Sequence, residues 1–241
     1  MKKVSVKNLL KPKEVFAEGL SFYKVFLIFV FACIFGTYYE QVLKLIADGV
    51  WVTQQGVIYG PFNPVYGFGA AGLIALLVRK KRKWYWSFLL AAVVAGFFEY
   101  FLHELEYIFT GNVSWDYTYL KLYIPSIVTK GATAGTSVLH MAIWGALGLF
   151  LEFIVYPILS KLIEKIPPLQ GKMVCNALAV FLTINILLTG AVFIRYGERQ
   201  KGKEPLTFIG AWLDRNYPDE YVHEIFPDKK LEETEHNNET L

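Results

Sequence analysis

The sequence is poor in charged residues and in cysteine. Of its 241 residues 19% are charged, whereas soluble domains have about 25%. By contrast, 54% are hydrophobic and 17% are aromatic. This composition excludes an ordinary soluble domain and indicates a membrane protein. The two cysteines, Cys33 and Cys175, lie in separate apolar runs without histidine or cysteine neighbours at metal-ligand spacing, so we interpret them as small hydrophobic residues.

Long apolar runs are the most prominent feature of the chain. A transmembrane helix needs about 20 largely apolar residues, and the sequence predicts an all-α fold, a polytopic membrane helix bundle of about five transmembrane helices. The first run is too long for a removed signal peptide and is poorly followed by a small-residue cleavage site, so we expect it to remain as an anchor. The five runs are Phe22–Ile46, Val57–Val78, Trp86–Phe109, Val138–Leu159 and Val174–Ile194.

The chain divides into three parts by composition. Residues 1–21 form a basic N-terminal arm, residues 22–195 a transmembrane helical domain and residues 196–241 a polar tail. Two apolar stripes in the tail predict short amphipathic helices that lie on the membrane or dock on the loops. The final segment, Leu231–Leu241, is rich in Glu, Asn and Thr and is expected to be disordered. The stripes are Phe208, Ile209, Trp212 and Leu213, then Tyr221, Val222, Ile225 and Phe226.

The distribution of lysine and arginine predicts an orientation, because cytoplasmic loops retain positive charge. The lysines of the N-terminal arm and the run Arg79–Lys83 belong on the cytoplasmic side. The connections Ala47–Gly56 and Thr110–Ser137 contain few cations and suit the opposite side. Five spans would place the C-terminus outside, but the cations that follow the fifth run favour the cytoplasm, so the side of the C-terminus stays open.

Two glycine-rich motifs resemble nucleotide-binding sequences but lack the required context. Gly67-x-Gly69-x-x-Gly72 lies in an apolar run without a preceding strand, so helix packing through small residues explains it better. Gly197–Lys203 resembles a phosphate loop, but Glu204 stands where a Ser or Thr would hold magnesium. We therefore expect no ATPase activity and no cofactor in this chain. The net charge of +3 is concentrated at membrane ends, so we expect no nucleic-acid partner either.

An ionisable stripe lies in the third apolar run. Glu99, His103 and Glu106 recur at i, i+4 and i+7, so a helix would stack them on one face. Each ionisable group in a membrane helix costs roughly 2.5–3.5 kcal/mol and usually faces a partner, a water-filled cavity or a transport path. The stripe predicts a functional polar centre, although a structural network with neighbouring helices would also account for it. His and carboxylate side chains can bind a metal, but nothing in the sequence fixes a third and fourth ligand in space, so we assign no metal and leave open whether the stripe binds metal or protons.

The second apolar run begins with a break in the helical pattern. Pro61 and Pro64 lie within Gly60–Gly67 and cannot continue a regular helix, so we expect the helix to begin near Pro64. The free N–H groups of such a helix start can bind an anion or a carboxylate, with Asn63 and Tyr66 beside them. A tight turn that enters the membrane is the alternative interpretation.

Three further polar residues are candidates for the same pocket. Glu40 falls near the outer end of the first run, where it would lie beside the break or extend to the interface. Asp116 lies between Trp115 and Tyr117, an arrangement that suits membrane anchoring or a lid. His140, at the start of the fourth run, would serve as a ligand or in hydrogen-bonded packing.

A set of short motifs follows in order along the chain. They are Gly36-Thr-Tyr-Tyr-Glu40, Gly60-Pro-Phe-Asn-Pro-Val-Tyr-Gly67-Phe-Gly69-Ala70, Glu99-Tyr100 followed by Glu106, Trp115-Asp116-Tyr117, Trp144-Gly145 and Tyr156-Pro157. This set resembles the putative ABC-transporter type IV, CmpB-like membrane proteins of bacteria, over about residues 34–165. The segment 217–227 is similar to the ending of that family. The resemblance implies a permease.

Two positions depart from the family pattern. Asn63 stands where a small residue such as Cys is usual, and Ala134-Gly135 stands where a Gly-Arg pair is usual. If that arginine pairs with a glutamate in relatives, this protein has either lost the counter-ion or replaced it with Lys130 or His140.

Three functions remain open from the sequence. The leading one is a permease-like subunit in the bacterial cytoplasmic membrane that needs a separate ATPase or works as a secondary carrier, with acidic residues that favour cations or protons. The second is a membrane-embedded enzyme or accessory factor acting on lipid or cell-envelope substrates, with Glu and His as general acid and base. The third is an assembly subunit whose charges pair with another membrane protein. Expected partners are the lipid bilayer, an ATPase or another membrane protein, and a second copy of the chain.

Overall fold

The computed structural model describes residues 15–111 and 113–227. Four helical stretches are long and apolar enough to cross a membrane, which confirms the all-α membrane bundle. The lysines of the N-terminal arm and the segment Leu231–Leu241 lie outside the described residues. The four stretches are α1 (Phe22–Asp48), α3 (Trp84–Thr110), α6 (Pro168–Gln200), and a continuous run made of α4 (Val138–Phe150), a π-helical turn η2 (Leu151–Val155) and α5 (Tyr156–Ile163).

The second predicted span is shorter than expected. Its helix α2 covers only Pro64–Leu77, with Pro64 in the first turn as the sequence predicts. Its 14 residues extend about 21 Å, less than the roughly 30 Å of hydrocarbon core. The predicted span Val57–Val78 is therefore wrong at its start: residues 57–63 are not helical. The reason is that the prolines lack N–H donors and Gly60 adopts a φ of +81°.

The chain before α2 runs along α6 instead of forming a helix. The Ile58 N–H donates to Thr189 Oγ1 at 3.0 Å and the Tyr59 N–H to Asn185 Oδ1 at 3.2 Å, while Asn185 Nδ2 donates to the Tyr59 carbonyl at 2.7 Å. Non-helical backbone at membrane depth requires such internal partners. Asn185 and Thr189 therefore supply the hydrogen-bond partners of the irregular segment that leads into α2.

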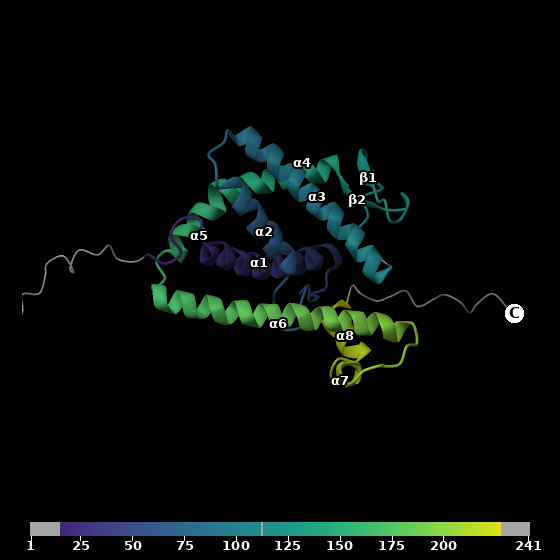
Figure 1. Cartoon of the computed structure of the whole chain (residues 1–241). Coiled ribbons are helices and arrows are strands. Elements are labelled where there is room, and N and C mark those ends of the chain that lie inside the picture. Colours follow the sequence, from purple (N-terminus) through teal and green to yellow (C-terminus); the bar gives the residue numbers. More distant parts are fainter. Residues whose placement is uncertain (1–14, 112, 228–241) are drawn as a thin grey trace, which may run out of the picture.

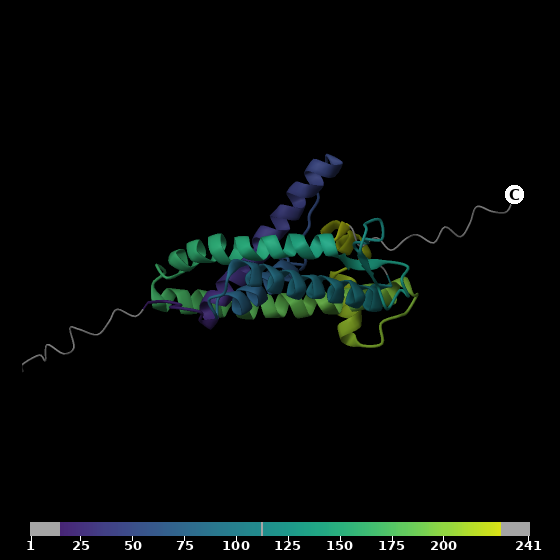
Figure 2. The ribbon, with the colours of Figure 1, turned by 90° about the horizontal axis from the view of Figure 1, so that it is seen from above.

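The helices alternate in direction, so their connections lie at two opposite ends of the bundle (Figures 1 and 2). At one end Phe16 packs on Gly171 and Lys24 forms an ion pair with Glu164. The turn 79–83 also lies at this end, which we call the basic end. The opposite end holds the segment 49–63, the connection that follows α3 and the C-terminal helices. We call it the hairpin end.

Close approach of α1 to α2 depends on glycine. A Cβ atom on Gly67 would overlap Cys33 Sγ and the Phe29 ring, and one on Gly36 would overlap the Tyr66 ring. By contrast, a Cβ atom on Gly72 would meet nothing within 4 Å. Within the dinucleotide-like motif, helix packing therefore accounts directly for Gly67 but not for Gly72.

A small β-hairpin, which we did not predict from the sequence, forms in the connection between α3 and α4. Strand β1 (Tyr123–Pro125) pairs antiparallel with β2 (Ala134–Ser137), and Ile124 lies opposite Thr136. Strand β2 is buried and packs against α3. The hairpin therefore closes one side of the bundle at this end.

The two short helices predicted in the tail are confirmed, and they dock on α6. Helices α7 (Phe208–Asn216) and α8 (Asp219–Ile225) follow α6. Their buried side chains join Ile58 and two residues of α6 in one hydrophobic cluster; the cluster consists of Ile58, Val192, Tyr196, Leu213, Tyr217, Val222 and Phe226. Helix α7 lies across α6, end-on in Figure 1 and lengthwise in Figure 2.

Candidate functional site

The carboxylate of Glu99 lies between α3 and the connection that carries the hairpin. Oε1 accepts a hydrogen bond from the Tyr117 hydroxyl at 3.0 Å, and Oε2 accepts one from Thr136 Oγ1 at 2.7 Å. Both partners come from the segment between α3 and α4. Among the described residues, no Lys or Arg forms an ion pair with Glu99. The carboxylate is thus held by neutral donors, which leave its negative charge uncompensated.

His140 lies on the other side of Tyr117. The two rings stack with centroids 3.8 Å apart, and His140 Nδ1 lies 3.0 Å from Ser137 Oγ. Burial, and then the Glu99 carboxylate, raise the pKa of the Tyr117 phenol, so Tyr117 stays a neutral donor. Ser137 is fully buried and caps α4 by accepting from the His140 N–H at 3.2 Å. The Ser137–His140 contact is therefore a helix cap, which does not suit a nucleophile and its base.

Asp116 holds the connection together. Its Oδ1 accepts from the Ala134 N–H at 2.7 Å and from the Thr118 N–H at 3.1 Å, and its Oδ2 accepts from Thr118 Oγ1 at 2.6 Å. Burial raises the pKa of this carboxyl, but the donors of Thr118 and Ala134 outweigh burial and lower it overall. Asp116 thus positions Tyr117 next to Glu99 and has its acceptor sites occupied.

His103 is fully buried beside the same connection. Its Nδ1 lies 3.5 Å from Oε1 of Glu104, and its ring meets the Trp115 ring edge-on with centroids 5.8 Å apart. In the described part of the chain, neither ring nitrogen nor Glu104 Oε1 has a hydrogen-bond partner. A Cβ atom on Gly135 would lie 3.1 Å from His103, so the glycine at this departure from the family pattern makes room for the imidazole.

Two more glutamates of α3 lie near this connection. We did not single out Glu104 from the sequence, and Glu106 has different hydrogen-bond partners from Glu99. Glu104 is buried and its Oε2 accepts from the Val128 N–H at 2.8 Å, which ties the hairpin to α3. Glu106 accepts from the Ser114 N–H at 3.0 Å and from Ser114 Oγ at 2.5 Å near the end of α3. The stripe therefore exists on one helix, but its members meet different partners.

The break before α2 brings together three residues that the sequence singled out. The Tyr66 hydroxyl donates to Glu40 Oε1 at 2.7 Å, and Asn63 Nδ2 lies 3.5 Å from Glu40 Oε2. Asn63 Oδ1 also accepts from the Val65 N–H at 3.2 Å, so the helix start that was expected to be open has its own side-chain cap. Pro61 lies in the turn that the Gly56 N–H closes on the Phe62 carbonyl at 2.9 Å, and Pro64 begins the helix.

The two carboxylate clusters lie at the same end of the bundle. Of the two expected counter-ions, Lys130 is exposed in the hairpin turn, whereas His140 stacks on Tyr117. The hairpin end therefore concentrates acids and hydroxyls, with a histidine as the nearest basic group to Tyr117.

Two further buried polar groups had no clear sequence signal. Glu152 lies in the π-helical turn η2, and its Oε2 is buried without a hydrogen-bond partner in the described part of the chain. Lys24 is fully buried at the basic end, where its Nζ donates to Ser160 Oγ at 2.7 Å and forms an ion pair with Glu164. Neither the π-turn nor the Lys24 pairing follows from hydrophobic periodicity.

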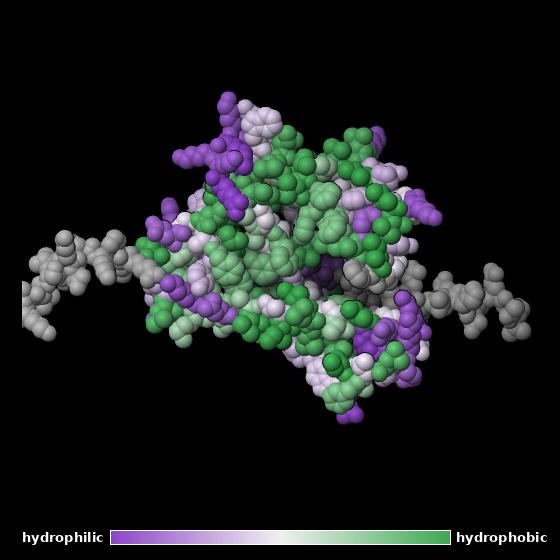
Figure 3. All heavy atoms as spheres, viewed as in Figure 1, coloured by the Kyte–Doolittle hydropathy of each residue, from purple (hydrophilic) through white to green (hydrophobic). Residues whose placement is uncertain are grey.

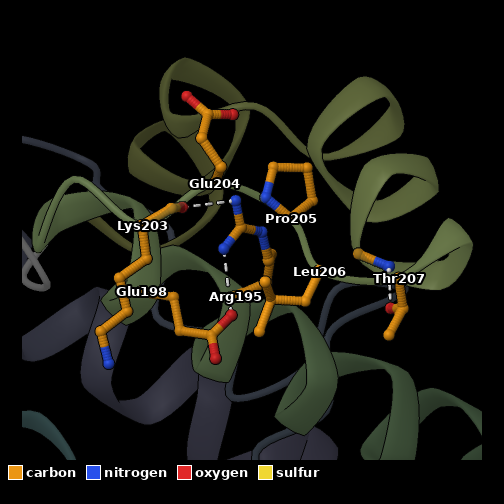
Figure 4. A pocket seen from close by; sticks show the side chains of 8 residues that line it. Arg195, Glu198, Lys203, Glu204, Pro205, Leu206 and Thr207 are labelled. Atoms are coloured by element: carbon orange, nitrogen blue, oxygen red, sulfur yellow. Dashed lines mark hydrogen bonds and ion pairs between the residues drawn. The ribbon is translucent and has the colours of Figure 1, made fainter.

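Two of the cations that follow the fifth run, Arg195 and Arg199, pair with acidic residues of the tail. Arg195 donates to both carboxylate oxygens of Asp214 at 2.8 and 3.1 Å, and Arg199 donates to Asp214 at 2.7 Å and Asp219 at 2.6 Å. Figure 4 shows the Arg195 guanidinium between the Glu198 carboxylate and the Lys203 carbonyl. Hydrogen bonds from Arg195 lower the pKa of the Asp214 carboxyl. Burial raises this pKa, but Arg195 and Arg199 together outweigh burial, so the pKa lies below its usual range. These paired arginines are compatible with a C-terminus at the hairpin end.

The sequence that resembled a phosphate loop forms the end of α6 and the turn after it. A cavity of about 210 Å³ at this turn is lined by Arg195, Glu198, Lys203 and Glu204 among others. Arg195 already has its acidic partners there. With two glutamates in the lining, the cavity does not suit a phosphate group.

The long apolar helices define a multi-pass membrane protein. The chain belongs to the family described as putative ABC-transporter type IV, whose model matches residues 27–190. The match includes both carboxylate clusters and stops before α7 and α8. No curated protein and no solved structure matches the chain.

Proposed function

We propose that the protein is a permease-type subunit of a membrane transporter and that the hairpin end binds a positively charged group at Glu99. One observation carries the proposal: Glu99 is held between α3 and the connection by two hydroxyl groups, Tyr117 and Thr136, with no Lys or Arg paired to it in the described residues. Hydroxyl donors orient a carboxylate but do not cancel its charge. A carboxylate within a membrane helix favours a cationic partner for that reason.

Energy for transport would come from another chain. The glycine-rich motifs of this sequence lie in a membrane helix and at the end of α6, so neither forms a nucleotide site. The family supports an ATPase partner, which would bind at the cytoplasmic side. By the positive-inside rule that side is the basic end, with Arg79–Lys83 and the turn after α5.

Two measurements test this proposal. The first is purification from native membranes in mild detergent, followed by mass spectrometry and an ATP-hydrolysis assay. We expect a nucleotide-binding ATPase in stoichiometric amount and hydrolysis that depends on it; a stable preparation without any ATPase would contradict the subunit role.

The second measurement is topology. The natural cysteines Cys33 and Cys175 are buried, so single cysteines can be introduced at Asp48 and Lys81 with little background. An impermeant thiol reagent should label position 48 only from outside and position 81 only after the inner face is opened. Labelling of both positions from the same side would overturn the alternation on which the proposal depends.

A further inference from the structure

The basic end has a charged turn that the proposed transport site does not use. Residues Arg79–Lys83 are five consecutive cations between α2 and α3, and the sequence has no Asp or Glu between Asp48 and Glu99. Among the described residues, none of the five forms an ion pair. Figure 3 shows the turn as a strongly hydrophilic patch at the upper left, directly beside apolar side chains.

A shallow cavity lies at this patch. It has a volume of about 410 Å³ and is lined by Lys81, Arg82, Trp86 and Leu90. The lining is graded along the helix: two cations lie in the turn, Trp86 follows in the first turn of α3, and Leu90 lies one turn further into the bundle. This order corresponds to the phosphate, the glycerol region and the first acyl carbons of a phospholipid.

Arg82 is fixed at the rim of the cavity. Its Nη1 donates to the carbonyl oxygens of Leu76 at 3.0 Å and Leu77 at 3.1 Å, which are the last residues of α2. A tethered guanidinium loses less side-chain freedom when it binds a phosphate, and its planar fork suits phosphate oxygens. Arg82 is therefore a positioned anion ligand, unlike the exposed Arg79 and Lys80 in the same turn.

Aromatic side chains set the depth of the cavity. Trp84, Tyr85 and Trp86 are 64%, 44% and 55% exposed. Exposed Trp and Tyr side chains lie at the headgroup level of a bilayer. The cations of the turn therefore lie where lipid phosphates lie.

We propose that this cavity binds the headgroup phosphate of one anionic phospholipid, with Lys81 and Arg82 as its ligands and with Trp86 and Leu90 against the glycerol and upper acyl region. A free phosphate ion would use only the cationic half of the lining. The apolar half assigns the site to a membrane lipid. Because the site lies at the opposite end of the bundle from Glu99, it is independent of the proposed transport site.

The test compares two double variants with the same change of charge. Lys81→Gln/Arg82→Gln removes the two cations of the cavity, and Arg79→Gln/Lys80→Gln removes two cations of the same turn that do not line it. Native mass spectrometry in detergent would count bound phosphatidylglycerol against phosphatidylcholine, with inorganic phosphate and glycerol phosphate as soluble competitors. Unfolding temperatures without added lipid would confirm that each variant is folded.

We expect saturable binding of one phosphatidylglycerol to the parent and to Arg79→Gln/Lys80→Gln. Binding to Lys81→Gln/Arg82→Gln should be about 10- to 30-fold weaker. Phosphatidylcholine should not compete, and soluble phosphates should compete only weakly. Equal weakening in both double variants would mean a general charge effect and would overturn the site, as would full competition by inorganic phosphate.

The tether of Arg82 to α2 requires a second comparison, since its loss could unfold the protein. The single variants Lys81→Gln and Lys80→Gln leave that tether intact and differ only in whether the lost cation lines the cavity. Weaker phosphatidylglycerol binding in Lys81→Gln alone supports the site. Equal binding in the two single variants contradicts it.

Discussion

The hydroxyl of Tyr117 donates to Glu99 across 3.0 Å, and this bond joins the connection after α3 to the helix itself. The His140 ring stacks on the Tyr117 ring, and the two ring centroids are 3.8 Å apart. One tyrosine thus links a membrane carboxylate to the start of α4. The site depends on a connecting segment as much as on the helices.

Replacing Tyr117 with Phe tests that link. The substitution keeps the ring that stacks on His140 but removes the hydrogen-bond donor to Glu99. We expect the free energy of unfolding to fall by about 1.5–3 kcal/mol, the usual contribution of a hydrogen bond to a charged group. The measurement is thermal unfolding in detergent. Tyr119→Phe is the control, because Tyr119 is 75% exposed. Equal unfolding temperatures for the two variants would mean that the Tyr117 bond contributes nothing.

Substitution of two glycines in α2 tests whether each is needed for helix packing. Gly67→Ala places a methyl group against Cys33 and Phe29 and should destabilise the bundle by about 1–3 kcal/mol. Gly72→Ala meets open space in the same helix and should be neutral or stabilising by up to about 1 kcal/mol. Thermal unfolding of both variants measures the difference. If Gly72→Ala were the more harmful change, the account of α1–α2 packing would be wrong.

The Lys24–Glu164 pair predicts a dependence on pH. Hydrogen bonding to Lys24 lowers the pKa of the Glu164 carboxyl below its usual 4.5. A carboxyl whose pKa is lowered on folding stabilises the protein above its unfolded pKa, and the stabilisation is lost as the pH falls through the folded value. Below about pH 4.5 the Glu164 carboxylate becomes protonated and this stabilisation is lost, so we expect the unfolding temperature of the parent to fall.

Glu164→Gln and Glu18→Gln provide the comparison. Glu164→Gln should be less stable at neutral pH, because it leaves the buried Lys24 without its carboxylate, and its acid slope should be shallower. Glu18 is exposed at the same end of the bundle, so Glu18→Gln should follow the parent. Parallel curves for Glu164→Gln and the parent would show that the pair does not contribute to acid stability.

Helix patterns predicted most of the fold because apolar runs of bilayer length have few alternatives. Pro64 marked the start of α2 correctly, since proline fits the first turn of a helix and no later position. The contacts of the irregular segment before it with α6 were missed, because they come from Asn185 and Thr189, which are 126 and 131 positions away from their partners. Sequence periodicity contains no information about such distant partners.

The candidate site was predicted by residue type but not by contact. The i, i+4, i+7 rule placed Glu99, His103 and Glu106 on one face, yet the hairpin decides which of them meets which donor. Glu104 was missed because it falls off that stripe, and the Val128 N–H that it accepts belongs to the unpredicted hairpin connection. Trp115 and Tyr117 were interpreted as membrane anchors or a lid, because two aromatic residues beside an acid do not indicate which group each of them contacts.

The central claim is that Glu99 binds a positively charged group, and the most direct measurement is stabilisation by cations. Unfolding temperatures of the purified parent, Glu99→Gln and Glu106→Gln would be compared with a panel of metal ions and alkylammonium ions. A bound cation raises the midpoint in proportion to its saturation. The account predicts that one class of cation stabilises the parent and Glu106→Gln but leaves Glu99→Gln unchanged. An equal response of Glu99→Gln and the parent would contradict it.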